Sequence, residues 1–288
     1  MPLDMPPIGL GTFRLKNDAV QQSIRKAIAL GYRHIDTAAI YRNEKDIGSV
    51  LQEIYTTSQN TICRSSLFIT SKLSPYDMKN PRQALLKSLT ELQTGYLDLY
   101  LIHWPAVARK PAASPEHKRL RLQAWKVLNE AKEEGLVRNI GVSNFTVQHL
   151  RELEETEWGI REAVVQMEVH PWYWRDAVEI QETFVEQGIL IVGYALLAEG
   201  KLLAEGCPQI LDETAERLNI SKVQLVLAWA LKKKIGVLVK SVDEIHLEQN
   251  LEVQSLVDGL ISEDCAAIDC LSRVGEEEKQ CWDPRLVI

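Results

Sequence analysis

Four polar side chains, Asp36, Tyr41, Lys72 and His103, stand at or just beyond the ends of apolar segments. Burying a charged group is costly unless it is paired, and a salt bridge between Lys72 and Asp36 is the simplest pairing. A lysine beside a tyrosine would lower the pKa of the phenol from about 10 toward neutrality. Such a phenol can donate a proton to a carbonyl oxygen, which an imidazole such as His103 can also orient.

Each of these residues also has a structural interpretation. Asp36 could cap the following helix, because caps are common where a strand leads into a helix, and Tyr41 could be a surface aromatic. Lys72 and His103, taken separately, could equally be structural. Catalysis is favoured because the reactive side chains follow successive strands, and the C-terminal strand ends of a barrel form one active face.

The elements that must position these residues alternate regularly along the chain. Short segments rich in Val, Ile and Leu predict strands at 7–13, 33–36, 67–73, 97–103, 138–142, 163–169, 189–195 and 237–240. Apolar residues at helical spacing predict helices at 18–30, 44–56, 81–93, 121–134, 146–157, 176–187, 221–234 and 243–253. Eight such units favour an α/β fold, a closed (β/α)8 TIM barrel forming a single domain over residues 1–288, rather than an open doubly wound sheet.

Three segments are longer than ordinary barrel loops, namely 104–119, 196–220 and the tail from about 258. All three would overhang the C-terminal mouth of the barrel. The first should be irregular because it contains several prolines. Residues 208–219 and 262–273 predict accessory helices, with Ser262 as the cap of the second.

Composition excludes several classes of protein. The 288 residues include 45% hydrophobic and 25% charged side chains, which is ordinary for a globular chain. The net charge of −7, from 33 basic and 40 acidic residues, disfavours nucleic acid as a partner. No apolar run approaches the roughly 20 residues that span a bilayer, so we expect no membrane partner. Five scattered cysteines and an N-terminus without a leader pattern predict a cytoplasmic protein, and no metal-ligand spacing is present.

Several motifs in order resemble those of the aldo-keto reductase family over essentially the whole chain. They are G-L-G-T-F at 9–13, G-Y-R-H-I-D-T-A-A-I-Y at 31–41, T-S-K-L at 70–73, L-D-L-Y-L-I-H-W-P at 97–105, G-V-S-N-F at 141–145, V-V-Q-M-E-V-H-P at 164–171, G-Y-A-L-L at 193–197 and V-K-S at 239–241. The resemblance implies a barrel that reduces aldehydes and ketones with an extended nicotinamide cofactor and no Rossmann domain.

The resemblance also implies a role for each matching residue. Tyr41 would be the general acid, Lys72 and Asp36 its tuning pair, and His103 the residue that orients the substrate. The residues that would bind the nicotinamide end are Gly11, Thr12, Asp36, Ser143, Asn144, Gln166 and the stacking Tyr194. Those that would bind the adenosine end and its 2′-phosphate are Lys240, Ser241, His246 and Asn250.

Departures from the family pattern concern the cofactor and the barrel floor. His246 stands where many relatives have an arginine, and a neutral imidazole is a weaker phosphate clamp than a guanidinium. We therefore expect NADPH to be preferred, by a smaller margin over NADH. Ala195 and Leu196 replace the usual serine and proline after the stacking tyrosine. The N-terminal hairpin is missing, so side chains alone, or Leu3 and Met5, must close the floor.

The substrate pocket is expected to contain Phe13 and Trp104 beside Tyr41 and His103, although packing is the default role of any aromatic residue. The W-Y-W run at 172–174 is a further candidate. The short tail suggests an open pocket for small or varied carbonyl compounds. The sequence therefore predicts a monomeric NADPH-dependent reductase of small molecules. The alternative is an NADPH-binding regulatory subunit that senses redox state.

Overall fold

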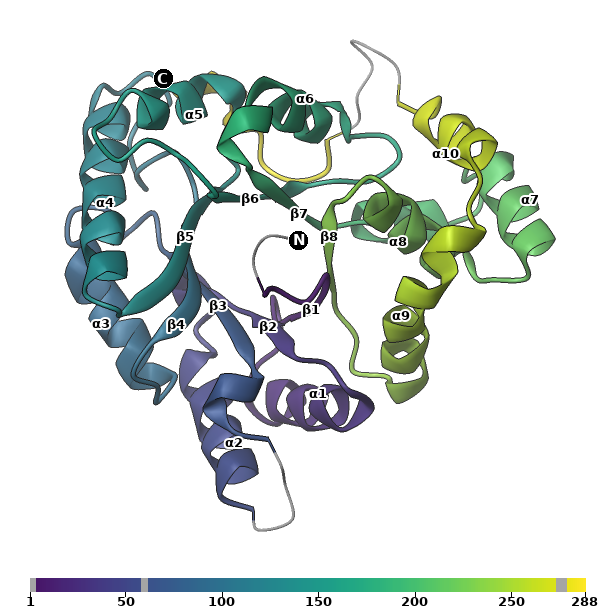
Figure 1. Cartoon of the computed structure of the whole chain (residues 1–288), viewed down its shortest axis with the longest axis horizontal. Helices are drawn as coiled ribbons and strands as arrows, with labels where there is room; N and C mark the ends of the chain where they lie inside the picture. Colours follow the sequence, from purple (N-terminus) through teal and green to yellow (C-terminus); the bar gives the residue numbers. More distant parts are fainter. Residues whose placement is uncertain (1–3, 58–61, 273–278) are drawn as a thin grey trace.

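Eight parallel strands close into a barrel in chain order, and the last strand pairs with the first (Figure 1). The structure is a computed structural model that describes residues 4–57, 62–272 and 279–288. The strands are β1 (Ile8–Gly11), β2 (His34–Asp36), β3 (Phe68–Leu73), β4 (Leu97–Ile102), β5 (Val137–Ser143), β6 (Val164–Glu168), β7 (Leu190–Tyr194) and β8 (Gly236–Val239). The predicted (β/α)8 barrel is confirmed.

Helices surround the barrel, as Figure 1 shows. They are α1 (Asn17–Leu30), α2 (Glu44–Thr56), α3 (Pro81–Glu91), α4 (Glu116–Glu133), α5 (Val147–Glu154), α6 (Arg175–Thr183), α8 (Lys222–Lys232) and α9 (Glu244–Leu256). Helix α4 begins earlier than the predicted residue 121, because Pro115 occupies its N-cap. Proline is tolerated at a helix start, where its missing N–H is not needed. The irregular loop after β4 is correspondingly shorter than predicted.

Two accessory helices, α7 (Gln209–Leu218) and α10 (Ser262–Asp269), pack against each other beside the barrel. The predicted cap of α10 was wrong by one residue. Ile261 is the N-cap, and its backbone N–H donates to the Asp264 carboxylate at 3.1 Å, so Ser262 is already helical. The predicted end of this helix, Arg273, lies outside the described residues.

The barrel floor is closed by apolar side chains. Met5, which precedes β1 and is 4% exposed, packs with a set of inward-facing strand residues, Phe68, Leu99, Leu101, Val164 and Val192. Figure 1 accordingly shows the segment that leads into β1 inside the ring of strands. Met5 therefore acts as the predicted partial plug, while Leu3 lies outside the described residues.

Gly141 brings two strands of the mouth together. A Cβ atom on this residue would lie 2.0 Å from the carbonyl oxygen of Val164, so only glycine permits the observed approach of β5 to β6. The register that follows sets Ser143 beside Gln166. Two polar residues predicted for the site thus become neighbours.

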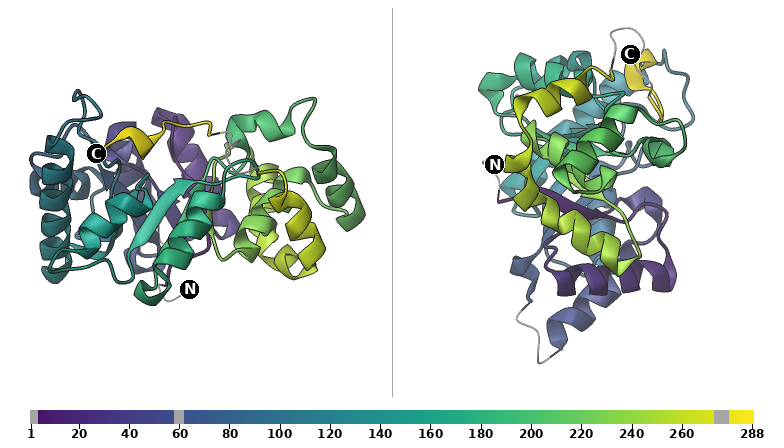
Figure 2. Two further views of the ribbon diagram at one scale, coloured as in Figure 1. Left: turned by 90° about the horizontal axis from the view of Figure 1, so that it is seen from above. Right: turned by 90° about the vertical axis from the view of Figure 1, so that its right-hand side faces the viewer.

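The two ends of the barrel are occupied by different parts of the chain. Met5 packs at the floor, and in the left view of Figure 2 the C-terminal segment crosses the opposite end. Within the described residues, no helix has the length and apolar character needed to cross a membrane.

Candidate active site

A buried ion pair joins β2 to β3 at the C-terminal mouth. Lys72 Nζ donates to Asp36 Oδ1 at 2.6 Å and to the carbonyl of Thr37 at 2.8 Å. The side chains of Lys72 and Asp36 are 0% and 3% exposed. The second carboxylate oxygen of Asp36 accepts from Gln166 Nε2 at 2.8 Å. The predicted salt bridge is therefore present, and Asp36 is a paired carboxylate rather than a helix cap.

Tyr41 lies directly above this pair. A short 3-10 helix, η1 (Ala39–Tyr41), follows β2 and carries the phenol back over the mouth. Lys72 Nζ is 5.2 Å from the centroid of the Tyr41 ring, and the His103 ring lies edge-on to that ring at 5.7 Å. Phe13 packs on the other side, with ring centroids 5.1 Å apart. The structure thus brings together all four residues proposed for catalysis.

The pKa of Tyr41 contradicts one expectation. Burial, together with the negative charge of Asp36 and the thiol of Cys281, holds the phenol pKa well above its ordinary value of 10. The lysine does not lower it, because its charge is compensated by Asp36 at 2.6 Å. Tyr41 is therefore a neutral phenol at neutral pH rather than a poised phenolate.

His103 is a neutral imidazole. Burial and the nearby positive charge of Lys72 hold the His103 pKa well below 6.5. Its backbone is fixed by a 3.2 Å hydrogen bond from its N–H to the Leu73 carbonyl. Its Nδ1 atom is buried without a hydrogen-bond partner in the described structure, so the ring retains unused hydrogen-bonding capacity.

A cavity of about 770 Å³ opens above these residues. The residues predicted from the sequence that lie in its wall are Gly11, Phe13, Asp36, Tyr41, His103, Trp104, Ser143, Asn144, Gln166, Tyr194, Lys240 and Asn250. Among the described residues, the wall omits Lys72, which lies beneath Asp36 and Tyr41, and also Thr12, Ser241 and His246. The aromatic run at 172–174 lies outside this wall as well, and Trp174 packs edge-on against Trp229 in the core.

The polar residues of the cavity are joined to one another. The Asn144 amide donates to Ser143 Oγ and to the His103 carbonyl, both at 3.0 Å, and accepts from the Tyr194 hydroxyl at 2.6 Å. Asn144 has a φ of 65°, a left-handed conformation that asparagine tolerates better than most residues. This network links the side chains of Ser143, Asn144 and Tyr194 to the backbone of His103, so it joins three strand ends before any ligand binds.

Comparison with known proteins agrees with this geometry. The sequence pattern of the Aldo/keto reductase family matches residues 7–273. The chain belongs to the aldo/keto reductase family. This reductase is 36% identical over 278 residues to methylglyoxal reductase DkgA of Yersinia pestis, with 95% of this chain and 92% of the relative covered. Glyoxal reductase of Bacillus subtilis (strain 168) is 36% identical over 275 residues, covering 94% and 90%.

A solved structure of a Gox0644 mutant in complex with NADPH superposes with a TM-score of 0.82 at 29% identity, covering 98% of this chain and 94% of that one. The family reduces carbonyl compounds and uses a nicotinamide cofactor. The cavity of this reductase fits such a cofactor, because residues expected at its nicotinamide end, such as Asn144 and Gln166, and at its adenosine end, Lys240 and Asn250, line one cavity. The described residues contain no group of three His, Cys, Asp or Glu side chains that could hold a metal.

Thr12 supports the site from below. It is 0% exposed, and both its hydroxyl and its backbone N–H donate to the Asp36 carbonyl at 3.0 Å. Its own carbonyl accepts from the Asn43 amide at 3.0 Å. Thr12 therefore ties β1 to β2 and fixes Asp36, whereas its neighbour Gly11 reaches the cavity wall.

The residues expected to bind the adenosine 2′-phosphate offer little positive charge. Lys240 is exposed at the rim, and the side chain of His246 is 68% exposed with its Nδ1 atom 4.0 Å from Asp243 Oδ1. Asp243 caps α9 by accepting the His246 N–H at 3.1 Å, and its own N–H donates to Ser241 Oγ at 3.0 Å. Two predicted phosphate ligands thus lie beside a carboxylate, which would weaken phosphate binding.

Sequence reasoning missed the residues that complete the cavity wall beside Tyr41 and His103. Gln280 and Cys281, from the tail, lie in the cavity wall near Tyr41. Trp282 lies edge-on to Trp104, with ring centroids 4.7 Å apart. The tail is held there by Glu168, whose only signal in the sequence was a charge inside the apolar run of the sixth strand.

Proposed function

We propose that this chain is an NADPH-dependent reductase of small aldehydes and ketones, with Tyr41 as the general acid. The observation that carries the proposal is the buried Lys72–Asp36 pair, 2.6 Å between charged atoms, directly beneath a phenol that faces a cavity beside His103. A structural role alone would not require a protonated phenol and a neutral imidazole side by side in one cavity wall.

When bound, the nicotinamide supplies a hydride to the carbonyl carbon. Tyr41 donates its proton to the carbonyl oxygen, which its raised pKa permits because the phenol is fully protonated at neutral pH. The ammonium of Lys72 then stabilises the phenolate that remains, in a site where little water screens the charge. His103 is neutral and can hydrogen bond the same oxygen and orient it.

The relatives support a preference for small carbonyl compounds, since two of them are named for methylglyoxal and glyoxal. Phe13 and Trp104 would hold the apolar part of the substrate. NADPH is the proposed cofactor because Lys240 is retained at the adenosine end and a relative was solved with NADPH. NADH would be used less well. We further propose that the chain acts as a cytoplasmic monomer.

Replacing Tyr41 by phenylalanine tests the assigned role. The change removes only the hydroxyl, so kcat for methylglyoxal should fall by about 10³-fold while NADPH binding, measured by quenching of tryptophan fluorescence, stays within about twofold. Trp104→Phe is the matched control, since it exchanges one wall aromatic for a smaller one and leaves the Tyr41 hydroxyl in place. A Tyr41→Phe enzyme that retains more than about a tenth of the wild-type kcat would show that another group is the acid.

A further inference from the structure

Glu168 occupies a particular place at the end of β6. Side chains two residues apart on a strand face the same way, so Glu168 shares a face with Gln166 and lies one repeat closer to the mouth. Gln166 donates to Asp36 at the level of the ion pair. Glu168 is 0% exposed and lies above that level, where the tail crosses the barrel.

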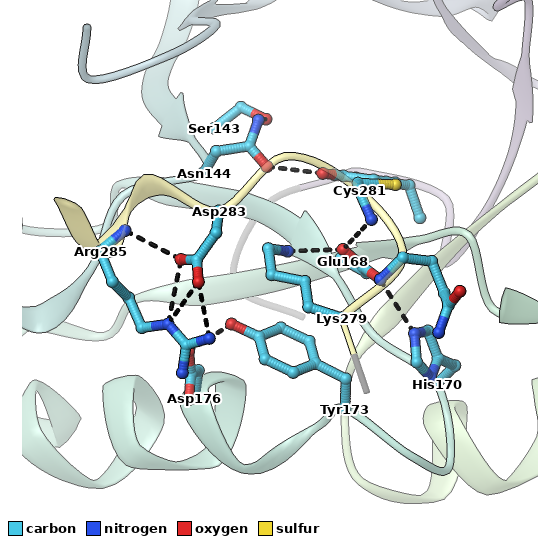
Figure 3. Close-up of polar contacts among 12 residues, drawn as sticks. Ser143, Asn144, Glu168, His170, Tyr173, Asp176, Lys279, Cys281, Asp283 and Arg285 are labelled. Carbon is cyan, nitrogen blue, oxygen red and sulfur yellow. Dashed lines mark hydrogen bonds and ion pairs between the residues drawn. The ribbon is translucent and has the colours of Figure 1, made fainter. Parts of the chain in front are cut away.

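Hydrogen-bond donors from two segments converge on the Glu168 carboxylate, as Figure 3 shows. His170 Nε2 lies 3.0 Å from Oε1. The other donors come from the tail: Lys279 Nζ at 2.5 Å, the Gln280 N–H at 2.5 Å and the Cys281 N–H at 3.0 Å. Two consecutive backbone N–H groups and an ammonium thus bind one buried carboxylate, which fixes the backbone as well as a side chain.

The Glu168 carboxylate stays charged, and the contact stays intact, over a wide pH range. Burial by itself would raise the Glu168 pKa, but the hydrogen bonds from His170 and Lys279 outweigh it and lower the pKa to about 2. Lys279 is further stabilised by the face of the Tyr173 ring, 4.4 Å from its Nζ atom. The stabilisation from the charged carboxylate is complete above the ordinary pKa of 4.5 and is lost only as the pH falls toward 2.

Residues 279–282, called the strap below, contribute directly to the cavity. Gln280 and Cys281 lie in its wall, and Trp282 packs against Trp104, which itself stacks beside His103. The tail residues that donate to Glu168 are Gln280 and Cys281, which line the cavity, and Lys279, which directly precedes them. Any movement of the strap away from Glu168 would therefore enlarge the cavity next to the carbonyl site.

We infer that Glu168 is a positioning residue that holds the strap across the mouth and thereby selects small carbonyl substrates. This inference rests on the proposed reductase function for the identity of the substrates, but the placement of the strap does not depend on it. Glu168 touches neither Tyr41 nor His103 in the structure, so it acts through Gln280, Cys281 and Trp282 rather than on the reacting atoms.

Glu168→Gln is the decisive variant, because it keeps the size of the side chain, removes its charge and turns an amide NH2 toward the strap donors. The first measurement is the alkylation rate of Cys281 by iodoacetamide, followed by peptide mass spectrometry so that each of the five thiols is read separately. Because burial and also the Glu168 charge raise the pKa of the Cys281 thiol, the labelling rate is measured as a function of pH, and the rate per thiolate is compared between the variant and the wild type. We expect this rate at Cys281 to be about tenfold higher in the variant, because the strap opens more often, with the other thiols unchanged.

The second measurement separates positioning from general damage. For methylglyoxal, KM should rise and kcat/KM should fall relative to a bulky aromatic aldehyde, shifting the selectivity ratio by about tenfold toward the larger substrate. The Kd for NADPH should stay within about twofold. Glu168→Asp, which keeps the charge on a shorter stem, should restore part of the selectivity.

Two further variants distinguish a specific effect of Glu168 from general misfolding. Lys279→Met removes one donor from the strap side and should change Cys281 labelling and selectivity in the same direction, to a smaller extent. Asp98→Asn is the matched control, since Asp98 is another buried carboxylate with several donors, but at the opposite end of the barrel. It should change neither readout.

Unchanged Cys281 labelling together with an unchanged selectivity ratio in folded Glu168→Gln and Lys279→Met would overturn the inference. Equal changes in Asp98→Asn would also overturn it, because they would reveal a general loss of stability. If the wild-type chain reduces no aldehyde, the proposed function fails, whereas the thiol labelling still decides whether Glu168 holds the strap.

Discussion

The two ends of the barrel each contain a buried carboxylate with cationic partners, and only one of them is equipped for chemistry. At the floor end, Asp98 accepts from Arg64 at 2.7 Å, Arg138 at 3.0 Å and the Ile69 N–H at 2.9 Å. Both arginines also stack on the Tyr96 ring. At the mouth, Asp36 has one ammonium and one amide, and its neighbours face a cavity.

The difference shows that a buried ion pair does not by itself mark an active site. The floor cluster joins β3, β4 and β5 and leaves its groups engaged with one another. The mouth cluster lies beneath a protonated phenol and beside His103 with a free Nδ1 atom. A buried cluster can take part in a reaction when it contains polar groups that neighbouring residues hold in place but that have no hydrogen-bond partner of their own.

The largest expected effect follows from removing the cation at the mouth. Lys72→Met deletes the charge beneath Tyr41 and leaves Asp36 with Gln166 alone. We expect kcat to fall by about 10³-fold and the free energy of unfolding to fall by about 3 kcal/mol. Steady-state kinetics and urea unfolding measure the two quantities. A kcat within tenfold of wild type would mean that the pair at the mouth is as purely structural as the one at the floor.

The corresponding change at the floor should affect stability only. Asp98→Asn leaves two arginines without their carboxylate, so the free energy of unfolding should fall by about 2 to 3 kcal/mol. We expect kcat and KM to stay within about twofold of wild type below the unfolding transition. Kinetics at 20 °C combined with urea unfolding make the test, and a loss of kcat larger than tenfold would break the distinction between the two ends.

A smaller effect concerns the far end of the mouth, where positive charge is scarce. His246→Arg replaces an imidazole that is 68% exposed by a guanidinium that can bind a phosphate through two hydrogen bonds. We expect the ratio of kcat/KM with NADPH to that with NADH to rise by about tenfold, which is about 1.4 kcal/mol. An unchanged ratio would show that the 2′-phosphate lies away from this residue. His246→Gln is the matched control.

The smallest expected effect is that of pH on kcat/KM, because neither His103 nor Tyr41 should change its charge near neutral pH. His103 becomes charged only well below pH 6.5, because its pKa is lowered, and Tyr41 loses its proton only well above pH 10, because its pKa is raised. Between about pH 6.5 and 9 both stay neutral, so kcat/KM, which reports the free enzyme, should vary less than about twofold. An inflection near pH 7 or 8 in the wild type that Tyr41→Phe removes would contradict the raised phenol pKa.

Most of the barrel follows from local pattern. Apolar strands and helical spacing locate β1 to β8 and their helices, and polar residues at strand ends locate Asp36, Lys72 and His103, because parallel strands share one mouth. The sequence predicts this helix only from residue 121, because proline usually breaks a helix, whereas Pro115 here is the N-cap of a helix that begins at Glu116. A proline can either end a helix or stand at its start, and tertiary packing decides which of the two occurs.

The rest of the site depends on contacts between distant parts of the chain. Thr12 was expected near the cofactor, but its hydroxyl is used by the Asp36 carbonyl. The Tyr41 pKa was expected to fall, but the charge of Lys72 is compensated by Asp36. Glu168 was passed over because its partners begin at Lys279, in a tail whose path no periodicity reveals.

The contact between Glu168 and Lys279 spans 111 residues of chain. The entropy of closing a loop rises with its length, so contacts between neighbouring strands and helices form earlier on average than this one. A folding chain would therefore assemble Asp36, Tyr41, Lys72 and His103 before the strap is seated. The four side chains proposed for catalysis, all within β2 to β4 and their loops, would thus be placed before the strap that narrows their cavity.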